Sequence, residues 1–189
     1  RGPGRLVGGV SCGGAWRTDD GGATWRVAAT GMQANFLPPE LAGDTDTQDP
    51  HRLAPCAADP DVIWCQHHCG IFRTTNNGDE WVEITEAGPS TFGFGVAAHP
   101  NDPLTAWFVP ALSDEVRVPV DGRLVVTRTR DGGKTFDVLT DGLPQRNAYD
   151  LILRHALDVD ATGERLLLGS TTGSLWYSDD AGDSFVQVS

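Results

Sequence analysis

The sequence predicts an all-β fold in which one small antiparallel sheet is repeated along the chain, and three observations support this prediction. An eight-residue pattern, which we call the box turn, has a hydroxyl residue first, Asp or Asn third, Gly fifth and an aromatic residue eighth. It occurs at residues 18–25, 74–81, 129–136 and 178–185, so successive copies begin 56, 55 and 49 residues apart. This spacing is about the length of a four-stranded propeller blade. The intervening runs are rich in Val, Leu, Trp and Phe and are bounded by Gly, Pro, Asn and Asp, as short antiparallel strands are.

The box turns divide the chain into four predicted blades, at approximately residues 1–29, 51–86, 92–141 and 148–189. Each blade has its innermost strand first and its box turn between the third and fourth strands. In the first blade RLVGGV, GAWRT and TWRVAA are the second to fourth strands, so the innermost strand is missing. The other blades are expected to be complete: HRLAPCAA, VIWCQHH, GIFRT and WVEIT; then FGFGVAAHP, TAWFVPAL, RLVVTRT and FDVLT; then AYDLILRHALDV, RLLLGST, SLWYS and FVQVS.

The number of predicted blades indicates an incomplete ring. About three and a half blades are present, whereas closed propellers typically use four to eight. We therefore expect a partial β-propeller that belongs to a ring of six to eight blades. The remaining blades would come from an upstream part of the same chain or from another copy.

The residues of the box turn are expected to act locally. The Asp or Asn and the hydroxyl residue can bond to main-chain N–H groups of the turn, and Gly takes a conformation that is closed to side chains. The aromatic residue is expected to pack inward beneath the turn. The third-position residues are therefore predicted to be structural: Asp20, Asn76, Asp131 and Asp180.

The four copies, TDDGGATW, TTNNGDEW, TRDGGKTF and SDDAGDSF, resemble the Asp box of the bacterial-neuraminidase (BNR) repeat, which is found in sialidases and related propellers. The stretches GVSCGGAWRT, QHHCGIFRT and GSTTGSLWYS also resemble the C-terminal half of bacterial propellers described as sialidase-like or glycosyl-hydrolase-like. The resemblance implies a glycan-directed propeller with a glycoside hydrolase activity. The alternatives are a non-catalytic scaffold that binds a protein or a carbohydrate, and a function that resides wholly in the missing blades.

Composition and net charge limit the classes of molecule that the chain is expected to bind. The 189 residues carry a formal net charge of −12, with thirteen Arg and a single Lys, Lys134. A surface of that sign repels phosphate groups, so nucleic acid and anionic membranes are not expected as partners. No window is long and apolar enough to span a membrane. The first residues contain neither an initiator Met nor a signal segment, which favours the cytoplasm, but a start inside a blade indicates truncation and leaves the compartment open.

The four cysteines have spacings that are weak as a metal signature: Cys12, Cys56, Cys65 and Cys69. Buried free thiols are the prediction for all four. A disulfide between Cys56 and Cys65 across a hairpin is the alternative.

Connectivity assigns each loop to one of two ends of the blades. The box turns and the turns between first and second strands lie at one end, the box end. The connections between blades and the turns between second and third strands lie at the other, the loop end. Two loop-end connections, 30–50 and 111–122, are long, and long loops on a rigid scaffold are where function usually sits. They carry five charged candidates: Glu40, Asp49, Asp114, Glu115 and Arg117.

Two hydrolase chemistries are compatible with these candidates. An inverting glycosidase needs two carboxylates about 6.5–9.5 Å apart, and Asp49, Asp114 and Glu115 are the candidates for them. A sialidase-like enzyme needs a Tyr nucleophile backed by a Glu, for which Tyr149 and Glu40 are proposed, because Tyr177 is expected to pack in an outer strand. Arginines would bind the carboxylate of an acidic sugar, and the candidates are Arg117, Arg146 and Arg154.

Histidines lie beside the same loops. His67 and His68 occupy the turn between the second and third strands of the second blade, and His51 enters its innermost strand. Adjacent strand residues point to opposite faces, so at most one of His67 and His68 faces the mouth of the propeller's central channel, which we expect at the loop end. His51 with one of them and an acidic residue could hold a metal ion, but hydrogen-bonded neutral imidazoles are favoured. The sequence therefore predicts ligand-binding histidines, and no metal or cofactor.

Overall fold

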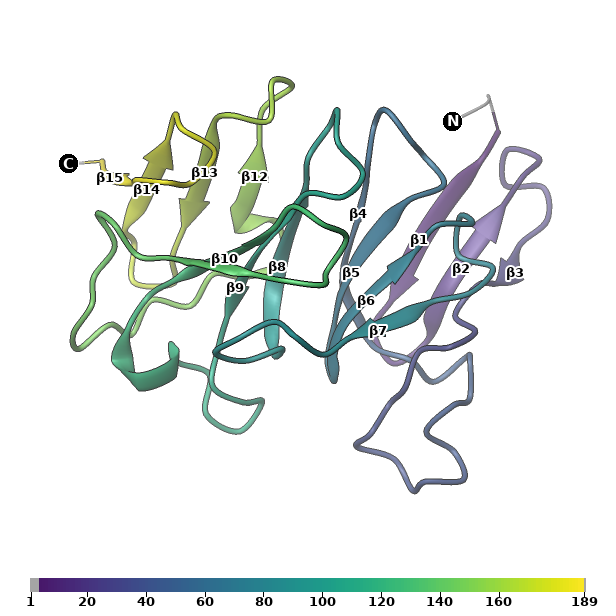
Figure 1. Cartoon of the computed structure of the whole chain (residues 1–189). Coiled ribbons are helices and arrows are strands. Elements are labelled where there is room, and N and C mark those ends of the chain that lie inside the picture. Colours follow the sequence, from purple (N-terminus) through teal and green to yellow (C-terminus); the bar gives the residue numbers. More distant parts are fainter. Residues whose placement is uncertain (1–3, 189) are drawn as a thin grey trace.

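The computed structural model describes residues 4–188, which form fifteen β-strands in four antiparallel sheets and two short 3₁₀ turns (Figure 1). We call the sheets blades 1 to 4 in chain order. Blade 1 contains β1 (Leu6–Val10), β2 (Gly14–Thr18) and β3 (Arg26–Val27). Blade 2 contains β4 (Pro50–Pro55), β5 (Ile63–His67), β6 (Gly70–Thr74) and β7 (Val82–Ile84). Blade 3 contains β8 (Gly93–Ala98), β9 (Ala106–Pro110), β10 (Val126–Thr129) and β11 (Asp137–Leu139), and blade 4 contains β12 (Leu157–Val159), β13 (Leu166–Gly169), β14 (Leu175–Ser178) and β15 (Val186–Gln187).

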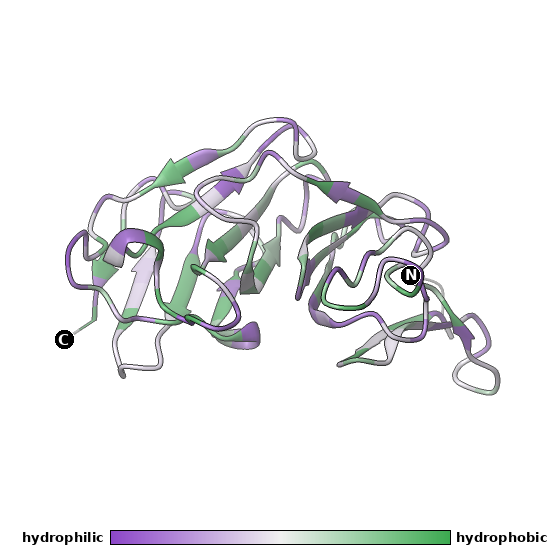
Figure 2. Ribbon diagram, turned by 90° about the horizontal axis from the view of Figure 1, so that it is seen from below, coloured by the Kyte–Doolittle hydropathy of each residue, from purple (hydrophilic) through white to green (hydrophobic). Residues whose placement is uncertain are grey.

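Each blade is a simple meander in which strands that follow one another in sequence are hydrogen-bonded neighbours. The blades follow one another round an arc, and residues 4–188 do not close it into a ring (Figure 2). The first strand of blade 3, β8, contacts the first strands of blades 2 and 4, and β1 contacts β4, so these strands line the inside of the arc. This arrangement puts the turns of all four blades at the same two ends.

Several strands are shorter than predicted, and the innermost strand of blade 4 differs most from its prediction. The innermost strand of blade 4 was predicted over AYDLILRHALDV, but β12 begins only at Leu157. Before it, Arg154–Ala156 form the 3₁₀ turn η2, whose N-cap Leu153 is extended. The prediction that Arg154 and His155 lie along the innermost strand is therefore wrong. A second 3₁₀ turn, η1 (Val120–Gly122), lies in the long loop of blade 3, where Asp121 adopts a positive φ of 54°.

The four box turns share one hydrogen-bond pattern. In the first, the Thr18 hydroxyl accepts the Gly22 N–H at 2.9 Å and donates to Asp20 Oδ1 at 2.7 Å. Asp20 Oδ1 also accepts the Thr24 N–H at 2.9 Å. The bond from the fifth-position N–H to the first-position hydroxyl recurs at 3.0, 2.9 and 2.9 Å in the other copies. Every fifth-position glycine has φ between 89° and 95°, a conformation that side chains other than glycine's rarely adopt.

The aromatic residue of a box turn packs against the preceding blade. Trp81, in blade 2, is 2% exposed, and its indole N–H donates to the Ala28 carbonyl of blade 1 at 2.8 Å. Its main-chain N–H donates to the Thr30 carbonyl at 2.8 Å. Phe185 of blade 4 repeats the main-chain contact, donating to the Asp141 carbonyl at 3.0 Å. Trp25 of blade 1 is 46% exposed, so inward packing was wrong for this copy, because residues 4–188 place no blade before the first.

The hydrophobic core lies mainly between blades. One cluster joins Ala15 and Met32 to Ile63, Phe72 and Trp81, and so holds blade 1 against blade 2. Corresponding clusters lie between blades 2 and 3 and between blades 3 and 4. Each junction therefore has its own core, which is how a repeat protein stabilises a chain without one central core.

The state of the four cysteines tests one further expectation. All four cysteines are free thiols, so no Cys56–Cys65 disulfide is present. Only Cys56 and Cys65 are buried, whereas Cys69 is half-buried and Cys12 is exposed, so the prediction of burial was wrong for the last two. Within residues 4–188 no helix has the length and apolarity needed to span a bilayer.

Candidate functional site

A group of histidine and carboxylate side chains lies at the loop end, where blades 1, 2 and 3 meet. Asp49 ends the long connection from blade 1 and directly precedes β4, which contains His51. His68 lies in the two-residue turn between β5 and β6, and Asp114 lies in the loop that follows β9. We call Asp49, His51, His68 and Asp114 the loop-end cluster.

Asp49 is the centre of the cluster. Its Oδ1 accepts the Ser11 hydroxyl at 2.7 Å and the Cys12 N–H at 3.3 Å, both from the turn between β1 and β2. Its Oδ2 faces the two histidines, 3.9 Å from His51 Nε2 and 3.5 Å from His68 Nδ1. Burial raises the pKa of Asp49, but the hydrogen bonds from Ser11 and Cys12, with the attraction that His51 and His68 exert when protonated, outweigh it, so the pKa is lowered on balance.

His51 is buried and has a defined tautomer. Its Nδ1 lies 2.7 Å from the Gly93 carbonyl oxygen of β8, so Nδ1 carries the proton and donates it. Nε2 therefore presents its lone pair to Asp49. The ring stacks on Phe94, with centroids 4.5 Å apart and planes 12° from parallel. Burial lowers the pKa of His51, which favours the neutral ring.

His68 stands between two carboxylates. Nδ1 is 3.5 Å from Asp49 Oδ2 and Nε2 is 3.6 Å from Asp114 Oδ2, and 20% of the side chain is exposed. Its main-chain N–H donates to the Asp49 carbonyl at 2.9 Å, which holds the turn against the start of β4. Both ring nitrogens therefore face the cluster, and the ring remains accessible from the loop end.

His67 does not belong to the cluster. It is fully buried, and both ring nitrogens face main-chain N–H groups, that of Asp49 at 2.9 Å and that of Cys69 at 3.0 Å. Burial lowers its pKa to about 4, so the ring is neutral at pH 7. Of the two adjacent histidines, it is therefore His68 whose ring faces the Asp49 and Asp114 carboxylates.

Aromatic rings border the cluster. Phe36 meets the His68 ring edge-on at 5.1 Å and is 48% exposed, and Phe92 meets it at 5.9 Å. Arg117 donates to both the Asp114 carboxylate and its main-chain carbonyl, and its guanidinium carbon lies 5.5 Å from the centroid of the Phe94 ring. Sequence reasoning missed these rings. Their signal was Phe36, the one aromatic residue of the 30–50 loop, and the FGF stretch at residues 92–94, where β8 begins.

Several predicted site residues lie apart from the cluster. Tyr149 is 67% exposed at the entry to blade 4, and no hydrogen bond within residues 4–188 joins it to Glu40, itself exposed in the 30–50 loop. Glu115 is exposed, and its pKa is lowered by its own main-chain N–H and by the Ser113 hydroxyl. Arg146 and Arg154 are also exposed. Tyr177 was expected to pack in its strand, but 42% of it is exposed.

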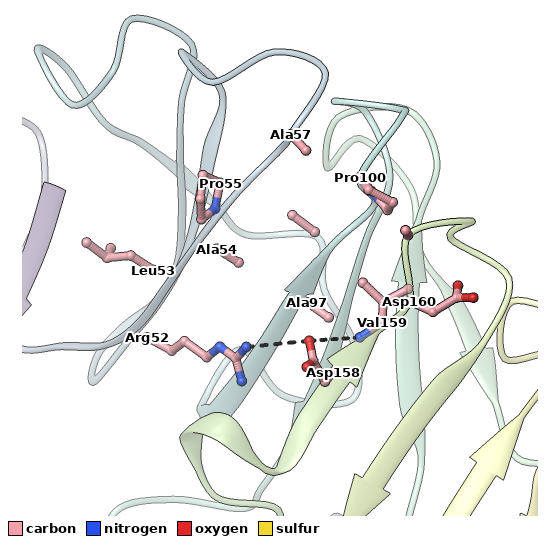
Figure 3. Close-up of a pocket in the computed structure, with 12 residues that line it drawn as sticks. Arg52, Leu53, Ala54, Pro55, Ala57, Ala97, Pro100, Asp158, Val159 and Asp160 are labelled. Atoms are coloured by element: carbon pink, nitrogen blue, oxygen red, sulfur yellow. Dashed lines mark hydrogen bonds and ion pairs between the residues drawn. The ribbon is translucent and has the colours of Figure 1, made fainter. Parts of the chain in front are cut away.

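Apart from the loop-end cluster, the inside of the arc contains a hollow, which is lined by the first strands of blades 2, 3 and 4 (Figure 3). Its main polar feature is Arg52, whose Nη1 donates to the carbonyls of Leu157 at 2.8 Å and Arg154 at 2.6 Å. Its Nη2 lies 4.0 Å from Asp158. The arginine that lies inside the arc is thus Arg52, and Arg154 contributes its carbonyl. Because its guanidinium bonds main-chain carbonyls, Arg52 acts as a brace between blades.

No protein-family model and no curated protein sequence matches the chain. Solved structures match it in fold. An ancestral GH74 enzyme superposes with a TM-score of 0.71 and 14% identity, over 100% of this chain and 23% of that one. The GH74 xyloglucanase from Xanthomonas campestris superposes with a TM-score of 0.64 and 19% identity, over 99% and 29%. The β-propeller domain of Cps50 (Swd1) from Myceliophteria thermophila superposes with a TM-score of 0.61 and 14% identity, over 97% and 51%. The chain is a partial β-propeller.

This chain matches about a quarter of the length of each GH74 enzyme, 23% and 29%. Sequence identities of 14–19% to these structures establish the fold alone. Its chemistry must therefore be inferred from its own residues. The loop-end cluster can accept hydrogen bonds at Asp49 and Asp114, donate or accept at His68, and present the exposed ring of Phe36. These are the groups of a polar ligand site with an aromatic wall.

Proposed function

We propose that this propeller binds a carbohydrate at its loop end, through the loop-end cluster and the ring of Phe36. The observation that carries the proposal is the contact between a half-exposed aromatic ring and a histidine held by two carboxylates. The likeness to GH74 propellers supports the fold on which such a site would stand. The four box turns support a place among Asp-box propellers, with the site at the end opposite the boxes.

The chemistry of the cluster suits a sugar. Sugars have apolar C–H faces that pack on aromatic rings, and hydroxyl groups that donate to carboxylates and exchange bonds with imidazole. Phe36 offers the ring, Asp114 is 37% exposed and offers acceptors, and Arg117 offers a cation that could pair with the carboxylate of an acidic sugar. A ligand at this place would contact both long loops.

A glycan array followed by titration calorimetry with the best ligand tests the proposal. Phe36→Ala and Asp114→Asn should each weaken binding by about 5- to 150-fold, since each removes a contact of roughly 1–3 kcal/mol. Leu41→Ala and Asp44→Asn are matched controls, because both residues are exposed in the same loop as Phe36 and lie outside the cluster. No array signal, or equal losses in variants and controls, would overturn the proposal.

Glycoside hydrolysis is the second candidate, and the positions of Asp49 and Asp114 favour it. These carboxylates stand on opposite sides of the His68 ring, with contacts of 3.5 and 3.6 Å, which is compatible with the separation of about 6.5–9.5 Å in inverting enzymes. Asp49, with its lowered pKa, would be the base, and Asp114 the acid. His68 fills the space between them, so a substrate would have to displace its ring.

Turnover of a panel of aryl glycosides and sialosides tests hydrolysis. Loss of turnover in Asp114→Asn, with Tyr149→Phe unchanged, would support the carboxylate pair. The reverse pattern would support the sialidase-like mechanism, in which Tyr149 is the nucleophile and Glu40 its partner. Absence of turnover together with glycan binding would leave a non-catalytic, carbohydrate-binding propeller.

A further inference from the structure

We propose that Asp49, His51 and His68 form a binding site for a divalent transition-metal ion, with zinc as the reference ion. The inference goes beyond carbohydrate binding and does not depend on it, because it rests only on the geometry of these three side chains. One ligand atom from each lies within 4.8 Å of the others. Two imidazoles and one carboxylate are a donor set typical of zinc sites that retain an open position.

The separations are close to those that a metal ion imposes. Ligands about 2.0–2.1 Å from a tetrahedral ion stand roughly 3.3 Å apart. Asp49 Oδ2 is 3.5 Å from His68 Nδ1 and 3.9 Å from His51 Nε2. The Asp49 separations need to close by a few tenths of an ångström, whereas the two histidine nitrogens lie within 4.8 Å of each other and have to approach by up to about 1.5 Å. His68 is partly exposed and can supply such a movement, whereas His51 is fixed by its stack on Phe94.

Each ligand has a partner that orients it. Asp49 Oδ1 is occupied by Ser11 and Cys12, which leaves Oδ2 free. His51 donates Nδ1–H to the Gly93 carbonyl, which leaves the Nε2 lone pair free. Ligating histidines almost always donate their other ring N–H to a carbonyl or a carboxylate, and such partners fix the tautomer.

His68 completes this pattern. With Nδ1 directed at the ion, its Nε2–H points to Asp114 Oδ2, 3.6 Å away, in the arrangement of a carboxylate–histidine–metal triad. Asp114 is therefore a positioning residue and not a ligand. The net charge of −12 also raises the local concentration of cations around the chain.

The competing explanation is a protonated His68 paired with both carboxylates. That arrangement accounts for the position of His68, but it requires nothing of His51, whose free lone pair also faces Asp49. A bound metal ion accounts for both the position of His68 and the free lone pair of His51. The two explanations predict opposite results in a binding experiment at neutral pH.

The experiment uses the untagged 189-residue chain, stripped with EDTA and titrated with Zn²⁺ by calorimetry, with the bound metal counted by mass spectrometry. One equivalent should bind with micromolar or tighter affinity. His51→Gln and His68→Gln should lower the affinity more than a hundredfold, and Asp114→Asn by about 10–100-fold, as loss of an orienting partner does. His99→Gln is the control, because His99 lies at the box end and stacks on Trp107.

Co²⁺ absorption identifies the ligands independently. Nitrogen and oxygen donors give weak visible bands, whereas thiolate from the nearby Cys12 or Cys69 would add a strong ultraviolet charge-transfer band. Less than half an equivalent of bound zinc, a thiolate band, or equal losses in His68→Gln and His99→Gln would overturn the proposal. Circular dichroism of each variant establishes that a lost signal is not a lost fold.

Discussion

Truncation of Trp81 is expected to be among the most damaging single changes in this propeller, and truncation of Trp25 to be much milder, although both occupy the eighth position of a box turn. Trp81 is 2% exposed and packs on blade 1, whereas Trp25 is 46% exposed and has no preceding blade among residues 4–188. The comparison therefore isolates the contact between blades from the residue type and from its place in the turn.

The magnitude follows from burial. A tryptophan buries about 150–250 Å², and at about 25 cal/mol per Å² its transfer from water stabilises the fold by roughly 4–6 kcal/mol. Trp81→Ala also removes the indole bond to the Ala28 carbonyl, a contribution of about 1 kcal/mol. Relaxation around the cavity returns part of this, so we expect a loss of about 3–5 kcal/mol, the usual range for such truncations. Trp25→Ala leaves no cavity and should cost about 1–2 kcal/mol.

Urea unfolding followed by far-UV circular dichroism measures both variants without relying on tryptophan fluorescence. With a slope of about 1–3 kcal/mol per molar urea, Trp81→Ala should lower the midpoint by at least 1 M, and Trp25→Ala by less than half as much. Equal losses in the two variants would refute the view that the aromatic residue of each box turn clamps the preceding blade.

Two further predictions concern the turns themselves. Hydrogen bonds from Thr135 and Ser184 lower the pKa of Asp131 and of Asp180 to about 2, so their contribution to stability is complete above their ordinary pKa near 4 and is lost as the pH falls toward 2. The urea midpoint should fall over that interval, and less steeply in Asp131→Asn, whereas a flat profile down to pH 2.5 would contradict the assignment. Gly142→Ala should cost at least 2 kcal/mol more than Gly173→Ala in the same assay. Both glycines have positive φ, 75° and 89°, but a Cβ at residue 142 would collide with a main-chain carbonyl of the fourth box turn, whereas nothing lies within 4 Å at residue 173. Similar losses would contradict the close approach of the Gly142 turn to the fourth box turn, and with it the tight contact between blades 3 and 4.

The fold could be predicted from the sequence because its determinants are local and repeated. The spacing of the box turns fixes the blade period, and a hydroxyl residue, a carboxylate and a glycine at set positions close the same turn in each copy. The exposure of Trp25 could not be read from the pattern, because it depends on a neighbouring blade and not on the turn. The 3₁₀ turn at residues 154–156 interrupts an apolar run that otherwise has the composition of a strand.

The end of the propeller that carries the cluster could also be predicted, since strand order alone assigns every loop to an end. Which side chains contact one another at that end could not be predicted. Whether His67 or His68 faces the Asp49 carboxylate depends on which of the two rings is enclosed by main-chain N–H groups. Packing decides this, and it encloses His67. Tyr149 and Glu40 were paired for their chemistry, and the chain provides no hydrogen bond between them within residues 4–188.

The stability of the blade junctions and the geometry of the loop-end cluster are coupled. Ser11 of blade 1 orients Asp49, and Gly93 of blade 3 orients His51, so residues from three blades must be docked before the cluster has its shape. Trp81 lies at the opposite end of blade 2, yet it clamps the blade that carries Ser11. A variant such as Trp81→Ala should therefore weaken zinc binding even while its circular dichroism remains that of a folded propeller, because part of the binding energy would be spent on docking blade 1. Trp25→Ala leaves the same junction intact and should bind zinc normally. A box turn would then influence the site without touching it, through the rigid placement of one blade against the next.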